Sequence, residues 1–310
     1  MAAFQPLVVD VKRHSTEDGP GIRSVVFFKG CPLRCSFCEN PEAQNPRVEI
    51  AFYLDRCNGS ALCAAVCPYD AIELEGPQRI RRDLCQRCGA CTEVCPTGAL
   101  KLIGKAYSPQ ELAEYLLRDR RYYEHSGGGV TLSGGEPTMY QDYVEQVLKL
   151  LKAENVHVVL ETGGHFHYES FRRKILPYVD LVYFSLKIAD PDLHKLHTGK
   201  SNTRIIENLN RLMKEPRVQV EGWIPIIPGI TDTRENLESL VGILRAAGVK
   251  TVKLLPYNPL GTSMEEALGR TRCAVPMTFM QPKELGRVHA MFSEIVTRTQ
   301  TAAIGEKTGP

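Results

Sequence analysis

Three cysteines on one short segment have the spacing of a ligand set for a metal cluster. Cys31, Cys35 and Cys38 form the pattern C-x3-C-x2-C, and thiolates are the usual ligands of iron–sulfur clusters. Three thiolates on one loop hold three corners of a cubane cluster, so the fourth iron is left free to bind a small molecule. Zinc is the alternative, but a structural zinc site takes four ligands, and the sequence has no fourth ligand nearby.

A second set of cysteines lies in a segment that is duplicated with a period of 28 residues. The stretch from Cys57 to Cys67 aligns without gaps on the stretch from Cys85 to Cys95. The second copy reads C-x2-C-x2-C-x3-C-P, which is typical of bacterial ferredoxins, and in two-cluster ferredoxins the fourth cysteine of each run serves the other cluster. This pattern favours two auxiliary iron–sulfur clusters over two zinc sites. The predicted ligand sets are Cys85, Cys88 and Cys91 with Cys67, and Cys57 and Cys63 with Cys95.

The first copy departs from this pattern, because Ser60 stands where its second cysteine is expected. Three interpretations stay open: Ser60 ligates iron through oxygen, another group substitutes for the cysteine, or the site holds a three-iron cluster. Since Cys57, Cys63 and Cys95 all remain, we predict an incomplete or altered cluster rather than the complete loss of one.

The composition of the chain limits where it works and what it binds. Ten of the 11 cysteines fall between Cys31 and Cys95, and only Cys273 lies outside; such close spacing favours metal ligation over disulfides and predicts a reducing, cytoplasmic setting. The 38 Lys and Arg nearly balance the 36 Asp and Glu, which leaves a net charge of +2 and predicts no nucleic-acid partner. No apolar run is long enough to span a bilayer, and the first residues do not read as a signal peptide, so no membrane partner is expected.

The rest of the chain alternates between strand and helix patterns. Short apolar runs bounded by Gly, Pro or Asn predict strands at 24–30, 130–135, 156–164, 181–187, 218–225 and 251–258. Helical patterns lie near 141–153, 168–176, 203–214, 234–247 and 282–297, and another helix is expected to begin after Ser108, with Glu111 completing a capping box. Six strands that alternate with helices indicate a parallel sheet, either a partial barrel or a doubly wound sheet, with ligand sites at the carboxyl ends of the strands.

Taken together, the motifs resemble those of a glycyl-radical-enzyme activating enzyme of the radical S-adenosylmethionine superfamily. The cysteine triad with Phe37 before its last member matches the superfamily's cluster motif, and residues 18–23, DGPGIR, match the N-terminal signature of the family. Residues 133–137, SGGEP, match the motif that binds S-adenosylmethionine. Further matches are Glu161 to Gly164, Leu186 with Lys187, and Leu255 to Asn258.

The resemblance implies an α/β fold: a partial (β/α)6 TIM-like barrel with an inserted ferredoxin-like two-cluster domain. The expected divisions are 1–50 for the first part of the barrel, 51–104 for the insert, 105–300 for the remainder of the barrel and 301–310 for a flexible tail. Such inserts mark a large subgroup of the family, which the formate-lyase activators generally do not share.

The resemblance also implies a reaction. In the family, S-adenosylmethionine chelates the open iron of a [4Fe-4S] cluster, is cleaved to a 5′-deoxyadenosyl radical, and the radical takes a hydrogen from a glycine of a partner glycyl radical enzyme. No catalytic side chain is needed beyond the cluster and the cofactor. The residues expected to contact S-adenosylmethionine are Phe37, Gly134, Gly135, Glu136, Ser185, Lys187 and Asn258. Asp18 and Arg23 are expected to hold the glycine loop of the partner.

Two departures limit what is carried over from the family. Many members have Asp where this chain has Ser185, and in the formate-lyase activators that Asp and the counterpart of Glu161 help hold a monovalent cation; we therefore do not predict this cation. Those activators also have His in place of Asn258.

The insert is interpreted as an electron relay fed by flavodoxin or ferredoxin, and docking of the partner enzyme is its alternative role. Two other functions are weighed: a radical enzyme that modifies a peptide or small molecule, and, ranked last, a non-catalytic iron–sulfur electron carrier.

Overall fold

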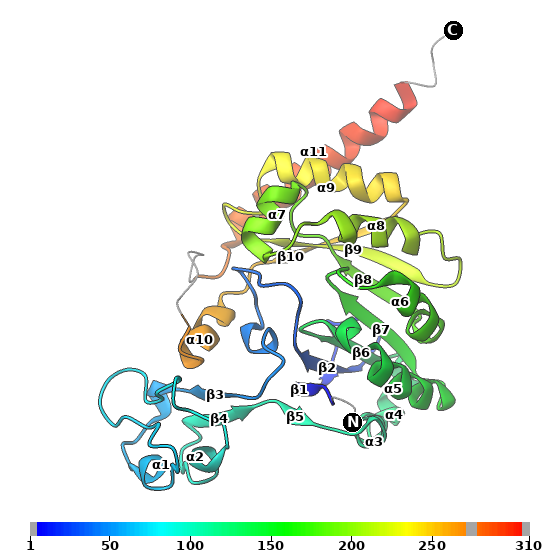
Figure 1. Ribbon diagram of the computed structural model, residues 1–310. Coiled ribbons are helices and arrows are strands. Elements are labelled where there is room, and N and C mark those ends of the chain that lie inside the picture. The colour runs from blue at the N-terminus through cyan, green and yellow to red at the C-terminus, as the bar shows by residue number, and fades with distance from the viewer. Residues whose placement is uncertain (1–4, 271–277, 306–310) are drawn as a thin grey trace.

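The fold is built on one eight-stranded sheet, seen in the computed structural model of Figure 1. The structure describes residues 5–270 and 278–305, so Cys273 lies outside the described residues. The strands follow the order β10-β9-β8-β7-β6-β2-β1-β5. They are β1 (Leu7–Ser15), β2 (Arg23–Lys29), β5 (Lys105–Ala106), β6 (Gly129–Gly134), β7 (His157–Thr162), β8 (Leu181–Ser185), β9 (Gln219–Ile226) and β10 (Thr251–Pro256).

The six predicted strands are confirmed as one continuous parallel set. Each pair from β2 to β10 is parallel and follows chain order, which is the arrangement of a partial (β/α)6 barrel. The sheet ends at β10 on one side and at β5 on the other, so the barrel stays open.

Helices cover the outer face of this sheet (Figure 1). They are α3 (Pro109–Leu117), α4 (Arg120–Ser126), α5 (Gln141–Ala153), α6 (Tyr168–Lys174), α8 (Thr203–Leu212), α9 (Arg234–Ala247) and α11 (Pro282–Gly305). Two further helices, α7 (Pro191–Thr198) and α10 (Leu260–Ala267), lie against the cysteine loop that follows β2. The predicted capping box begins α3, where Ser108 and Glu111 exchange hydrogen bonds of 2.7 and 3.2 Å.

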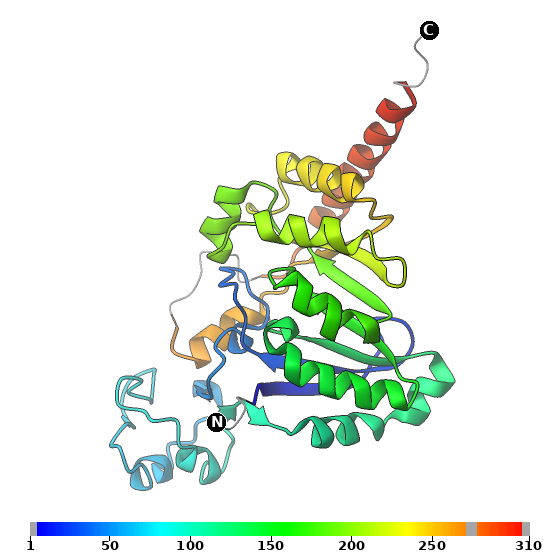
Figure 2. The same ribbon diagram turned by 45° about the vertical axis from the view of Figure 1, so that its right-hand side comes forward.

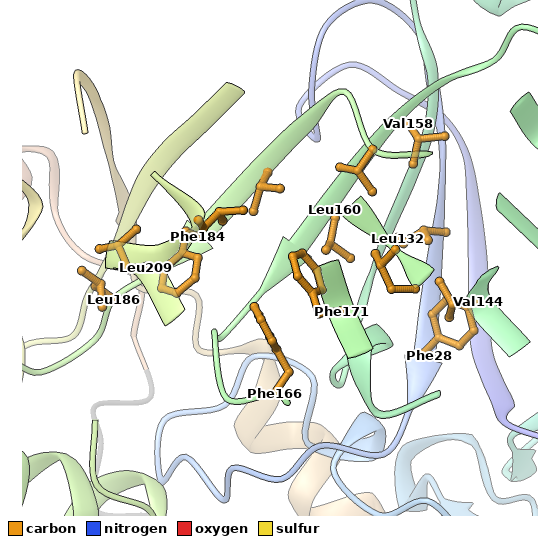
Figure 3. Packing of buried hydrophobic residues seen from close by; sticks show 14 of the residues in the cluster. Phe28, Leu132, Val144, Val158, Leu160, Phe166, Phe171, Phe184, Leu186 and Leu209 are labelled. Carbon is orange, nitrogen blue, oxygen red and sulfur yellow. The ribbon is translucent and has the colours of Figure 1, made fainter. Parts of the chain in front are cut away.

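Successive side chains of a strand point to opposite faces of the sheet, so the apolar core lies on one face and the inside of the barrel on the other. On β6, Val130 and Leu132 face the helices and join the main apolar core, whereas Thr131 and Ser133 face the barrel interior. Figure 3 shows the same pattern on the neighbouring strands, with Phe171 of α6 packed against the strand side chains. Burial of one such side chain contributes about 1.5–3 kcal/mol. The helix side therefore stabilises the sheet, and the other side is left for chemistry.

Strands β1 and β5 were not expected from the sequence. Strand β1 pairs antiparallel with β2 and with β5, and its register shifts twice, between Val8 and Asp10 and between Lys12 and Ser15. Val8 is buried in the main core and Val11 packs against it, whereas Asp10 and residues 12–14 are polar and exposed, so the strand has too little regular alternation to be predicted.

The insert forms a separate small unit. Strands β3 (Glu49–Phe52) and β4 (Leu100–Ile103) pair antiparallel outside the main sheet, and between them lie the short helices α1 (Leu62–Ala65) and α2 (Ala90–Glu93). Figure 2 shows this unit to one side of the barrel. It has its own apolar cluster around Ile50, Phe52, Ile80 and Leu100.

The end of the chain differs from the expected tail. Helix α11 runs on to Gly305, so residues 301–305 continue the helix, because the sequence there contains Ala302 and Ala303, and Ala favours helix. Residues 306–310 lie outside the described residues. No described helix is both long and apolar enough to cross a bilayer.

Candidate cluster and cofactor site

The loop that carries the first cysteine triad directly follows β2 and is held by backbone hydrogen bonds. Gly30 N–H donates to the carbonyl of Ala43 at 2.6 Å, and Cys31 N–H donates to that of Gln44 at 3.1 Å. From α7, the Thr198 carbonyl accepts from Arg34 N–H at 2.7 Å. The loop is thus closed on itself and anchored to a helix far along the chain.

The triad belongs to an apolar cluster of side chains at the carboxyl ends of the strands. Leu33 and the predicted Phe37 pack there with Ile188, Ile227 and Tyr257, which follow β8, β9 and β10, and the three cysteines pack against this cluster. The structure therefore packs the loop that follows β2 against residues that follow β8, β9 and β10, on the other side of the barrel.

Burial makes these thiols poor acids while no metal is bound. It raises the pKa of Cys31 to about 12 and also raises the pKa values of Cys35 and Cys38. The Lys187 ammonium opposes this rise at Cys31 and Cys35, but a strong positive charge is needed for all three to become thiolates.

The donor set fits a cluster with one open iron. It consists of three thiols on one loop in a dry pocket, beside one lysine. Among the described residues, no group of three or more His, Cys, Asp or Glu side chains is arranged to hold a single metal ion.

The two glycines of the SGGEP motif are required by close packing of β6 against the cluster loop. Gly134 has φ +100°, and a Cβ on it would lie 2.4 Å from the backbone nitrogen of Phe28. A Cβ on Gly135 would lie 2.2 Å from the carbonyl oxygen of Gly30. Gly30 also accepts a hydrogen bond from Glu136 N–H at 2.8 Å. These glycines position the segment that carries Cys31, a role that the sequence did not reveal.

The carboxylate of Glu136 ties β6 to the end of β7. It is buried and accepts from the hydroxyls of Thr138 at 2.7 Å and Thr162 at 2.9 Å and from Gly163 N–H at 2.8 Å. Burial raises its pKa, while the three donors act in the opposite direction. The side chain therefore holds two strand ends together, and its contact with S-adenosylmethionine stays a prediction.

Lys187 and its neighbours form the polar side of the pocket. The Lys187 ammonium donates to the Ser185 hydroxyl at 3.0 Å. The Asn258 side-chain oxygen accepts from Leu260 N–H at 3.0 Å, at the start of α10. Asn258 N–H bonds the carboxylate of Glu39, whose pKa is raised by burial. Glu39, directly after Cys38, was not selected from the sequence, because an isolated acidic residue gives no signal there.

The two residues expected to hold a partner's loop have different environments. The Asp18 carboxylate accepts from Ser15 and Lys12 and keeps 22% of its side-chain surface exposed. The Arg23 side chain is fully buried, and its guanidinium donates to the Thr131 hydroxyl at 2.7 Å and to the Val130 carbonyl at 2.7 Å. In this structure the donors of Arg23 hold the 18–23 loop to β6, and its contact with a partner stays a prediction.

The cysteines of the insert lie close to one another, and their division into crosswise ligand sets stays a prediction. Cys57, Cys63 and Cys95 line one pocket together with Ser60. Burial, together with the neighbouring thiols of Cys85, Cys88, Cys63 and Cys67, raises the pKa of the Cys91 thiol to about 11. All ten described cysteines are free thiols.

Comparison with known proteins identifies the family. The model of the radical SAM superfamily matches residues 85–266, and that of the 4Fe-4S dicluster domain matches residues 56–99. The trans-4-hydroxy-L-proline dehydratase activating enzyme of Clostridioides difficile is 40% identical over 264 residues, which cover 83% of this chain and 86% of the relative. The chain belongs to the glycyl-radical-enzyme activating enzymes of the radical SAM superfamily.

Another relative in this family is the choline trimethylamine-lyase activating enzyme of Oleidesulfovibrio alaskensis. It is 34% identical over 278 residues, which cover 87% of this chain and 89% of the relative. Among solved structures, a radical SAM methyltransferase from Sphaerobacter thermophilus has a TM-score of 0.53 at 16% identity and covers 94% of this chain and 75% of its own. That likeness shows the fold alone.

The inside of this activating enzyme's barrel holds a second buried carboxyl. Glu161, on β7, accepts from the Ser133 hydroxyl, and its other oxygen is buried without a partner among the described residues. Burial raises its pKa to about 7, and the charge of Asp18 raises it further. Tyr183 and Trp223 stack beside it inside the barrel, with ring centroids 4.0 Å apart. The sequence indicated Glu161 only as part of a motif, because its burial depends on the strands around it.

Proposed function

We propose that this activating enzyme carries out its radical chemistry at the loop of Cys31, Cys35 and Cys38, with S-adenosylmethionine held at the open iron. The observation that carries this proposal is the convergence of the triad, the SGGEP segment and Lys187 in one dry pocket at the strand ends. When bound, the [4Fe-4S] cluster and the cofactor supply reductive cleavage to a 5′-deoxyadenosyl radical.

The chain's own residues prepare and protect this chemistry. Leu33, Phe37 and Tyr257 exclude water around the thiols, so a reactive radical is sheltered from solvent. Lys187 places a positive charge where the carboxylate of S-adenosylmethionine would lie, and Ser185 orients that ammonium. Glu136 and the two glycines keep the end of β6 against the cluster loop.

The protein substrate is the glycine loop of a glycyl radical enzyme, which receives the radical by losing one hydrogen. The relatives are named for a dehydratase and for a trimethylamine-lyase, so partners with different chemistry are served by similar activators. What this chain recognises is therefore the glycine loop rather than the partner's own active site. Asp18 keeps a partly exposed carboxylate that can accept from backbone N–H groups of that loop.

The insert is assigned the role of relay, with two auxiliary clusters that accept electrons from flavodoxin or ferredoxin. The set that contains Cys88 has four thiols, and the set that contains Ser60 has three. Several insert cysteines are half-exposed, and Cys88 is exposed, which suits electron entry from a docked protein.

The deciding experiment is the formation of 5′-deoxyadenosine by the protein reconstituted with iron and sulfide without oxygen. Dithionite and S-adenosylmethionine should give product that disappears in Cys35→Ala, and addition of the partner enzyme should give the electron paramagnetic resonance (EPR) signal of a glycyl radical. Absence of product at full iron content would refute the proposal. Product without a glycyl radical on any glycyl radical enzyme offered would instead favour the alternative of peptide or small-molecule modification.

A further inference from the structure

The altered auxiliary site lies in a pocket of the insert. Its wall includes the three remaining cysteines and Ser60, and Arg79 reaches it from the segment between the two copies. The family relationship does not identify the fourth ligand of this set. The surroundings of Ser60 point to one.

The backbone around Ser60 repeats the backbone around Cys88, which holds the equivalent place in the other copy. Three pairs of equivalent positions have positive φ angles: Gly59 at 74° and Arg87 at 58°, Ala61 at 59° and Gly89 at 89°, and Asp70 at 50° and Gly98 at 65°. For a residue with a Cβ, such as Ala61, this conformation costs about 1–2 kcal/mol. Successive N–H groups in such turns form concavities that bind anions, including iron–sulfur clusters. The first copy therefore keeps the cluster-binding backbone although it lacks one thiol.

Ser60 occupies the ligand position in this backbone. Both Ser60 and Cys88 are exposed, and each precedes the left-handed residue that begins a short helix, Ala61 before α1 and Gly89 before α2. The Asn58 side-chain oxygen accepts from Ser60 N–H at 3.2 Å and fixes the loop. A hydroxyl at this position is presented to the same pocket as Cys57, Cys63 and Cys95.

Arg79 supplies a second, independent observation. Its Nε is buried and has no hydrogen-bond partner in the described part of the chain, which costs about 1–3 kcal/mol unless an acceptor is present. The pocket that Arg79 lines offers an anionic cluster as that acceptor. A guanidinium there offsets the negative charge of thiolates and of a deprotonated serine.

We propose that Ser60 is the fourth protein ligand of the auxiliary four-iron cluster held by Cys57, Cys63 and Cys95, and that Arg79 donates a hydrogen bond to this cluster. The inference rests on the proposed function of the insert. Ligation forms one iron–oxygen bond, releases the hydroxyl proton of Ser60 to solvent and transfers no electron.

The test compares matched substitutions in the two copies of the insert. Ser60→Ala removes the oxygen and Ser60→Cys restores a thiol. In the other copy, Cys88→Ser makes the ligand set that wild type has at Ser60, and Cys88→Ala makes the ligand set of Ser60→Ala. The full chain is reconstituted without oxygen, and iron and sulfide per chain, Mössbauer spectra and the EPR spectrum of the oxidised protein are recorded. We expect wild type, Ser60→Cys and Cys88→Ser to hold the same iron. Ser60→Ala and Cys88→Ala should each lose one iron and show the EPR signal of a three-iron cluster.

Arg79 is tested by the reduction potential of the same cluster. Arg79→Gln removes a positive charge that favours the reduced form, so the potential should fall, whereas Arg79→Lys should leave it nearly unchanged. Equal potentials in wild type and Arg79→Gln would overturn the assignment of Arg79.

Two results would overturn the assignment of Ser60: a three-iron signal of equal size in wild type and Ser60→Ala, or full retention of iron in Ser60→Ala. Formation of 5′-deoxyadenosine with dithionite depends on the first cluster and should persist in every one of these variants. Its absence in wild type would refute the proposed function without affecting the iron count at Ser60, so the two failures are distinguishable.

Discussion

The barrel and the insert both gather cysteines, but they expose them to water differently. In the barrel, Cys35 is buried among apolar side chains, and burial raises the pKa values of all three thiols. In the insert, Cys88 is exposed, and although burial acts to raise the pKa of Cys95, hydrogen bonds from the backbone and from the Thr97 hydroxyl together lower it. A site that makes a radical needs shelter, whereas a site that receives electrons from another protein needs access.

The largest effect is expected where this shelter depends on one glycine. Gly135→Ala would bring a Cβ within 2.2 Å of the Gly30 carbonyl, so the segment that carries Cys31 must move. Formation of 5′-deoxyadenosine should fall by about 100-fold or more, since misplacement of reacting groups by about 1 Å costs this much. Gly242→Ala is the control, because nothing lies within 4 Å of its added Cβ; equal losses in both variants would refute the packing argument.

The second prediction distinguishes the role of the insert from that of the barrel by changing the reductant that supplies the electrons. Cys85→Ala should slow reduction of the first cluster by flavodoxin or ferredoxin by about 10-fold or more, since an auxiliary cluster loses a thiolate ligand. With dithionite, which reduces the first cluster directly, product formation should stay close to that of wild type. Rapid-mixing spectroscopy with each reductant measures this difference, and an unchanged rate with the protein donor would end the relay hypothesis.

The third prediction concerns the buried ion pair that joins the two regions. Lys29, at the end of β2, is fully buried and donates to the Glu49 carboxylate of β3 at 2.6 Å, and Arg270 donates to the same carboxylate at 2.7 Å. Glu49→Gln leaves the Lys29 charge without its counterion, so the free energy of unfolding should fall by about 3 kcal/mol. Glu124→Gln breaks an exposed pair with Arg120 and should cost about 0.5 kcal/mol or less. Anaerobic chemical unfolding compares them, and similar losses would contradict this difference.

The smallest effect is a pH dependence from inside the barrel. The pKa of Glu161 is raised from 4.5 to about 7, so the folded state binds its proton more tightly than the unfolded state. Its favourable contribution is therefore complete below about pH 4.5 and is lost as the pH rises toward 7 and beyond. Compared with wild type, Glu161→Gln should gain about 2 kcal/mol of stability between pH 5 and pH 8. Unfolding at both pH values measures this gain, and parallel curves would show that Glu161 stays ionised.

The sequence predicted those features that depend on neighbouring residues along the chain. Apolar runs located six parallel strands, and cysteine spacing located both cluster systems. It missed β1, because this partly charged strand is held by backbone pairing with β2 on one side and with β5 on the other. It also missed α7, whose Thr198 carbonyl anchors the cluster loop at Arg34.

Residue roles were harder to predict than elements. Arg23 belongs to a recognisable motif, but its burial follows from the packing of β6 and β7 against it. Lys29 gave no signal, since its partner Glu49 lies 20 positions away, and Arg270, which pairs with the same carboxylate, lies 221 positions beyond Glu49. Contacts between distant segments decide whether a charged side chain meets a partner protein or the interior.

The pairing of β3 with β4 has a consequence for the history of this architecture. Glu49 lies opposite Ile103, and a Cβ on Gly104 would touch the aliphatic part of Lys29 at 3.0 Å. The chain thus leaves the barrel and returns to it at nearly the same point. A whole redox module can be gained, lost or exchanged there by closing a short turn, with no change in the order of the barrel strands. Activators with and without such modules can therefore share one ancestral scaffold. Transplanting a module is a practical way to let a new electron donor reduce that scaffold.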